Sequence, residues 1–165
     1  YSLHFILHQS PDIKIDRKRA LNFAVDIARS FAYLHSRSPP VIHRDIKPAN
    51  FLVDRAYKVK LCDFGLCNIR NNTAGTPNYM SPELLSGKPY NEKVDVYAFG
   101  LVLWEMVSRE VPFDGMLPGD IKTAVAENKE RPAMPLSCPR SVQKLIAECW
   151  DQDPAVRPSF ETIRS

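Results

Sequence analysis

The 165-residue sequence has no long run of like charge and no long uninterrupted apolar segment. Its 22 basic and 19 acidic residues are scattered, unlike the clustered basic surface that follows a nucleic-acid backbone. The longest apolar stretch, residues 96–107, is interrupted by Glu105 and falls well short of the roughly 18 apolar residues of a membrane span. Nothing resembles a signal peptide. We therefore expect no nucleic-acid partner and no membrane-spanning segment.

Cysteine is also scarce, with Cys62, Cys67, Cys138 and Cys149 as the full set. Their spacing lacks the pairs of a zinc site, and their density is too low for a disulfide-rich secreted domain. We expect reduced thiols and an intracellular, cytoplasmic location. The length fits one domain with one core, and there is no internal repeat or low-complexity tract.

Apolar periodicity predicts the main helices. Residues 17–35 repeat apolar side chains at three- and four-residue steps, with Asp16 as the expected N-cap. Residues 95–108 are apolar on nearly every side, which is typical of a helix buried at the centre of a domain. The proline-rich region that follows leaves room for helices near 120–128 and 141–151.

Two short segments, residues 51–53 and 58–61, flank a polar turn and predict a β-hairpin. Residues 66–80 are polar and contain asparagine, glycine and proline, which favours a loop of a length that usually carries function. Residues 1–9 alternate ambiguously and predict neither regular element. Composition and periodicity alone thus indicate a mostly helical domain without indicating what it does.

Polar motifs around the hairpin carry more information. In chain order they are His43-Arg44-Asp45, then Lys47 and Asn50, then Asp63-Phe64-Gly65, and finally Ser81-Pro82-Glu83. In order and spacing they resemble the catalytic-loop, DFG and APE motifs of the protein kinases. One such triplet alone would mean little, but three in the correct order form a strong signal.

The resemblance implies that residues 1–165 form the mainly α-helical large lobe of the protein-kinase-like (α+β) fold, with a short β-hairpin carrying the catalytic and DFG segments. The family's Gly-rich loop, its lysine strand and its glutamate helix have no counterpart in the sequence. We expect them upstream of Tyr1. Because positioning and electrostatic stabilisation supply almost all of the catalysis, we expect the chain to be nearly inactive without the small lobe.

The reaction explains the residue types. Transfer of a γ-phosphoryl group needs an aligned hydroxyl and cations that neutralise the phosphate oxygens, so acidic and amide groups must hold metal. By the resemblance, Asp45 accepts or orients the substrate hydroxyl proton and Lys47 contacts the transferring phosphate. Asn50 and Asp63 coordinate Mg²⁺, and Leu52 lies under the adenine of ATP. The alternative for Asp63 is an ordinary aspartate in a turn.

His43 could also indicate a Ser-His-Asp hydrolase, because histidine is the commonest general base at neutral pH. We expect His43 instead to pack beneath Phe64 as a structural residue, since the sequence has no G-x-S-x-G elbow. We expect His4, His8 and His35 to lie at the surface or at helix ends without a special role.

The resemblance also implies two structural pairings. Glu83 is expected to form a buried ion pair with Arg157. Asp95 is expected to accept backbone hydrogen bonds from the catalytic loop near His43 and Arg44. If the kinase interpretation fails, the alternative is a set of solvated surface charges.

Arg44 precedes the catalytic aspartate, where family members sense a phosphorylated activation loop through charge-assisted contacts. Thr73 is the expected acceptor, and a loop threonine that is never modified is the alternative. Thr76 resembles the threonine of the family's G-T-P segment, which bonds near the catalytic aspartate and lysine.

Lys47 and the segment from Gly75 to Met80 match the pattern of serine/threonine kinases, while Cys149-Trp150 and Arg157-Pro158 resemble tyrosine-kinase-like enzymes. The chain is therefore similar to the Raf-related and mixed-lineage members of the tyrosine-kinase-like group. This resemblance implies a kinase that uses ATP and Mg²⁺ to phosphorylate Ser or Thr of a protein substrate. The alternative is a non-catalytic, pseudokinase-like binding module, and the oligomeric state stays open.

Overall fold

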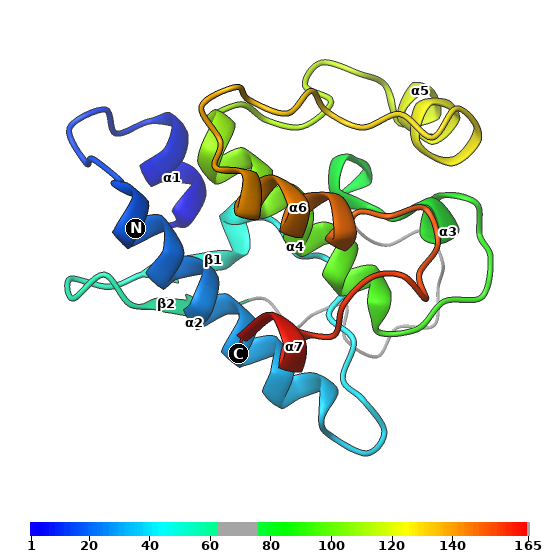
Figure 1. Cartoon of the computed structure of the whole chain (residues 1–165), viewed down its shortest axis with the longest axis horizontal. Helices are drawn as coiled ribbons and strands as arrows, with labels where there is room; N and C mark the ends of the chain where they lie inside the picture. The colour runs from blue at the N-terminus through cyan, green and yellow to red at the C-terminus, as the bar shows by residue number, and fades with distance from the viewer. Residues whose placement is uncertain (63–75, 165) are drawn as a thin grey trace.

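The computed structural model describes residues 1–62 and 76–164 (Figure 1). Within these residues no helix is at once long enough and apolar enough to cross a bilayer. The described elements are mostly helices, with one two-stranded sheet. The predicted fold class, a mainly helical lobe with a short hairpin, is confirmed.

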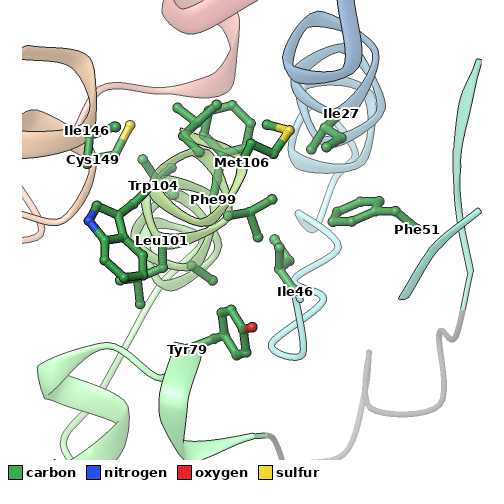
Figure 2. Packing of buried hydrophobic residues seen from close by; sticks show 14 of the residues in the cluster. Ile27, Ile46, Phe51, Tyr79, Phe99, Leu101, Trp104, Met106, Ile146 and Cys149 are labelled. Atoms are coloured by element: carbon green, nitrogen blue, oxygen red, sulfur yellow. The ribbon is translucent and has the colours of Figure 1, made fainter. Parts of the chain in front are cut away.

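The core is built around helix α4 (Lys93–Ser108), in which residues 94–106 are all buried. Its sequence is apolar on nearly every side, so each face needs an apolar neighbour. Figure 2 shows Phe99, Leu101, Trp104 and Met106 of this helix among side chains from other elements. The predicted central helix is confirmed, and it begins two residues earlier than expected.

Helix α6 (Arg140–Cys149) packs directly on α4. Gly100 permits this approach, because a Cβ atom built there would lie 2.8 Å from Cys149 Cβ and 3.4 Å from the Trp150 nitrogen. Burial at this contact raises the pKa of the Cys149 thiol to about 12, so the thiol stays protonated at neutral pH. The contact therefore depends on a glycine at position 100.

We expect Gly100→Ala to lower the free energy of unfolding by about 1–3 kcal/mol, measured by urea denaturation. Cys149 Cβ is fixed to the α6 backbone, so the helices must separate, and this cost exceeds the roughly 1 kcal/mol that alanine gains in helix propensity. Gly119→Ala is the matched control, since a Cβ there meets nothing within 4 Å. Equal stability of Gly100→Ala and wild type would contradict the close-approach explanation.

Helix α2 (Arg17–His35) begins where predicted, with the Asp16 carboxylate accepting the Arg19 backbone N–H at 2.7 Å. Its apolar side, which includes Phe23, Ile27 and Phe31, is buried. Helix α7 (Phe160–Arg164) packs along it, with the rings of Phe31 and Phe160 stacked at 5.1 Å between centroids.

The hairpin consists of β1 (Phe51–Val53) and β2 (Val59–Leu61), paired antiparallel with Phe51 opposite Leu61. Phe51 and Val53 face the core, whereas Leu52 points outward and is 48% exposed. The Asp54 carboxylate closes the turn by accepting the backbone N–H groups of Ala56 and Lys58, each at 2.9 Å. The predicted hairpin is confirmed, with β2 starting at Val59.

The N-terminal residues form a helix that the sequence left undefined. Helix α1 (Leu3–His8) is capped by the Ser2 hydroxyl, which accepts the Phe5 N–H at 3.1 Å. Leu3, Ile6 and Leu7 are buried. The Val53 N–H donates to the Tyr1 carbonyl at 2.7 Å, so the start of the chain is fixed to the hairpin.

The remaining elements are short. Two 3₁₀ turns, η1 (Pro48–Asn50) and η2 (Pro77–Tyr79), and helix α3 (Pro82–Leu85) lie around the site. Helix α5 (Pro118–Lys122) continues into a π-helical turn, η3 (Thr123–Glu127), and occupies the end of the molecule away from the hairpin (Figure 1). The helices predicted near 120–128 and 141–151 correspond to α5 with η3 and to α6.

Candidate active site

The loop between α2 and β1 is fixed by one buried carboxylate. Asp95, in the first turn of α4, accepts the backbone N–H of His43 with Oδ2 and that of Arg44 with Oδ1, each at 2.9 Å. His35 Nε2 bonds the same Oδ2 at 2.8 Å. Arg44 has a left-handed φ of 68°, which is unfavourable for a side-chain-bearing residue and is held here by these bonds. The backbone contacts expected of Asp95 are present.

The polar side chains predicted for catalysis converge on Asp45, the residue that follows the two whose backbone is bound by Asp95. Thr76 Oγ1 donates to Asp45 Oδ1 at 3.1 Å and accepts a hydrogen bond from Lys47 Nζ at 2.8 Å. Lys47 Nζ also lies 3.8 Å from Asp45 Oδ2. Asn50 Nδ2 donates to the Asp45 carbonyl at 2.7 Å and to its Oδ2 at 3.3 Å. One carboxylate is thus oriented by three neighbouring side chains.

The orientation of Asn50 suits a cation site. Its amide nitrogen is used twice by Asp45, so its carbonyl oxygen is the polar atom left to face a ligand. Amide and carboxylate oxygens are the ligands that Mg²⁺ prefers. Asp63, the expected second ligand, lies outside the described residues, as do Phe64 and Thr73.

The other predicted residues lie around this centre. His43 is fully buried, its Nδ1 accepts the Asp45 backbone N–H at 3.2 Å, and its ring meets Phe31 edge-on. Leu52 presents an exposed apolar surface on the hairpin that follows the loop. Arg44 Nη1 donates to the Tyr90 hydroxyl at 2.9 Å. Tyr90 was not among the residues predicted for the site, because no motif contains it.

Glu83 and Arg157 form the ion pair expected from the sequence. The two bonds are parallel, at 2.6 Å from Nη1 and 3.0 Å from Nη2, and both side chains are buried. Arg157 Nε also donates to the Asp151 carbonyl at 2.8 Å. The pair joins α3 to the segment that precedes α7. It therefore helps to hold α3, which follows Thr76 in the chain, in place.

Two histidines have partners that the sequence interpretation missed. His35 bonds Asp95, and His8 Nε2 bonds Glu105 Oε2 at 2.7 Å, so the expectation that neither has a special role was wrong. Tyr79 donates to the other Glu105 oxygen at 2.5 Å. Burial raises the pKa of Glu105, while the bonds from Tyr79 and His8 oppose that shift. The available signal was the lone acidic residue in the apolar stretch 96–107, because a buried carboxylate requires partners.

We expect Thr76→Val to lower kcat by about 10- to 100-fold, because the isosteric side chain no longer makes the two hydrogen bonds that position Asp45 and Lys47, and misplacing catalytic groups by about 1 Å costs roughly 100-fold. Steady-state kinetics of the full-length protein would measure this. Thr123→Val is the control, since Thr123 is exposed and, among the described residues, its hydroxyl bonds the Gly119 carbonyl one turn earlier. Unchanged kcat in Thr76→Val would show that Thr76 does not orient Asp45 and Lys47.

The helical lobe, the hairpin and the polar loop between them define a catalytic lobe of protein-kinase type. Comparison with known proteins agrees, because the family model described as protein tyrosine and serine/threonine kinase matches residues 2–165. The chain belongs to this family. The resemblance to tyrosine-kinase-like serine/threonine kinases, predicted from the motifs, is confirmed.

Several curated relatives are similar over almost the whole chain. It is 42% identical to serine/threonine-protein kinase CTR1 of Arabidopsis thaliana, with 98% of the chain and 21% of the relative covered. It is 45% identical to the probable serine/threonine-protein kinase drkC of Dictyostelium discoideum, covering 98% and 23%. Identity to serine/threonine/tyrosine-protein kinase HT1 of Arabidopsis thaliana is 40%, covering 98% and 43%. The chain thus spans less than half the length of each of these relatives.

Proposed function

We propose that the protein containing this chain is a serine/threonine kinase that transfers the γ-phosphoryl group of ATP to Ser or Thr of protein substrates, and that residues 1–165 are its large lobe. The observation that carries the proposal is the convergence of three side chains on Asp45, since Thr76 and Asn50 bond it and Lys47 lies beside it and bonds Thr76. The names of the relatives, which include serine/threonine kinases, support the choice of substrate hydroxyl.

Within this proposal Asp45 receives the proton of the substrate hydroxyl. Its carboxylate is held by Thr76 and Asn50, so a hydroxyl placed against it would be aligned with little reorganisation. Lys47 lies beside the same carboxylate and bears the positive charge that would stabilise the transferring phosphate. The side chains of Asp45 and Lys47 are 12% and 28% exposed, which leaves both accessible to substrate.

Asn50 and Asp63 would hold Mg²⁺, and the exposed Leu52 would contact the adenine of ATP. Bound Mg²⁺ neutralises the phosphate oxygens during transfer. The part that Asn50 plays is to present its amide oxygen, because its nitrogen is engaged by Asp45. Arg44 would bind phosphorylated Thr73 through charge-assisted hydrogen bonds.

An intracellular location is part of the proposal. The thiols of Cys62, Cys138 and Cys149 are unpaired, as expected in a reducing compartment. A pseudokinase-like binding module remains the competing hypothesis, and it would have no use for an ordered Asp45, Lys47 and Asn50.

The deciding experiment incubates the full-length protein with radiolabelled ATP, Mg²⁺ and a Ser/Thr-containing protein substrate, followed by phosphoamino-acid analysis. We expect label on serine or threonine, no transfer when EDTA removes the metal, and no transfer by Asp63→Asn. MgATP binding by calorimetry separates loss of binding from loss of chemistry. A folded full-length protein that neither binds MgATP nor transfers phosphate would establish the binding-module hypothesis instead.

A further inference from the structure

Helix α1 lies beside the C-terminal end of α4 (Figure 1). Side chains that can act as metal ligands cluster between these two helices. His4 and His8 are one helical turn apart on α1, with ring centroids 4.8 Å apart, and Glu105 belongs to the last turn of α4. One nitrogen from each histidine and one Glu105 oxygen all lie within 4.8 Å of one another. None of the three takes part in the proposed phosphoryl transfer.

We propose that His4, His8 and Glu105 bind one Zn²⁺ ion, with water as the fourth ligand. Two imidazole nitrogens and one carboxylate oxygen form a known set of zinc ligands, and histidines four residues apart on a helix face the same side. Zinc–nitrogen and zinc–oxygen bonds of about 2.0–2.2 Å place tetrahedral ligand atoms roughly 3.3 Å apart. The distance between His8 Nε2 and Glu105 Oε2, 2.7 Å, is below this value. The three ligand atoms are at most 4.8 Å apart, which is above it, so small side-chain movements would bring them to the zinc spacing.

The surroundings of Glu105 orient its Oε2 atom, which faces His8, for binding a cation. Tyr79 donates to Oε1, which fixes the carboxylate and leaves Oε2 directed at His8. Arg109 Nη1 donates to the Leu7 carbonyl at 3.3 Å and ties the end of α4 to α1. The two helices therefore hold their ligands close together without metal.

Electrostatics at this position also favour a cation. The Glu105 side chain is fully buried, so its negative charge is poorly hydrated. Glu105 also lies near the C-terminus of a 16-residue helix, where the aligned carbonyl groups attract positive charge. Zn²⁺ would lie between His8 Nε2 and Glu105 Oε2, and His8 would bind it as a neutral imidazole whose Nε2 carries no hydrogen.

The first test titrates ZnCl₂ into the full chain by calorimetry in a buffer that does not chelate zinc. We expect one equivalent to bind, and His4→Ala to weaken binding at least about 100-fold. This variant keeps the bond between His8 and Glu105, so its fold, checked by circular dichroism, is expected to be unchanged. Tyr79→Phe should weaken binding about 10- to 100-fold, because it removes the partner that orients the carboxylate.

Gln9→Ala is the control, since Gln9 is exposed immediately after α1 and offers no metal ligand, and it should bind zinc like the wild type. Co²⁺ replaces Zn²⁺ as a spectroscopic probe, and we expect tetrahedral d–d bands without a thiolate charge-transfer band. A thiolate band would assign the metal to cysteines, and equal affinity of His4→Ala and wild type would exclude His4 as a ligand; either result would overturn the proposal. Absence of any binding by the folded wild type would overturn it equally.

Discussion

Replacing Asp45 with asparagine is expected to lower kcat by about 10²–10⁴-fold, the usual contribution of a general base. Asparagine has nearly the same shape, and its amide oxygen can still accept a hydrogen bond from Thr76. The 3.3 Å bond from Asn50 is lost, but Asn50 keeps its 2.7 Å bond to the carbonyl of residue 45, so the loop should keep its conformation. What the substituted side chain cannot do is take the proton of the substrate hydroxyl. The loss should therefore appear in kcat, with little change in the affinity for MgATP.

The same substitution at Asp54 is the matched control. Asp54 is exposed at the hairpin turn, where it accepts two backbone N–H groups, and asparagine is equally suited to that position. Steady-state kinetics of the full-length protein, with urea denaturation of each variant, separate chemistry from stability. If Asp45→Asn retained wild-type kcat, proton acceptance by Asp45 would be excluded. If Asp54→Asn lost activity to the same extent, the effect would not be specific to the site.

The largest loss of stability is expected from Glu83→Ala, about 3–5 kcal/mol in the free energy of unfolding. This substitution leaves the Arg157 guanidinium, which has no exposed side-chain surface, without its counter-charge. The remaining bonds to the backbone carbonyls of Asp151 and Lys93 cannot replace a carboxylate, because a neutral carbonyl does not balance the buried positive charge.

Glu161→Ala tests whether the burial of an ion pair or the distance between its atoms determines the stability lost when the pair is broken. The pair between Arg164 and Glu161 has the same 2.6 Å separation, but its side chains are 44% and 67% exposed. Because water screens the exposed pair, we expect a loss of about 0.5 kcal/mol or less. Urea denaturation of both variants provides the comparison, and similar losses would contradict the assignment of the buried pair as the stronger one.

The sequence predicted those parts of the fold in which one strong pattern dominates. The continuous apolar stretch made α4 identifiable, and the resemblance of the polar motifs to those of protein kinases implied that Thr76 would bond near Asp45 and Lys47. Helix α1 was missed because six residues give too little periodicity, and because its stability comes from packing and from Tyr1 bonding to the hairpin. Glu105 drew attention only as an interruption, since its partners His8 and Tyr79 are 97 and 26 residues away in the chain.

The carboxylate of Asp95 has a consequence for the motions of this lobe. It accepts the backbone N–H groups of His43 and Arg44 while being part of the first turn of α4. These two amide hydrogens can reach water only when the loop leaves that turn, so they should exchange on the slow timescale of the core and not on that of a surface loop. The exchange rate of these two amides would therefore report how rarely the segment next to Asp45 separates from the core helix.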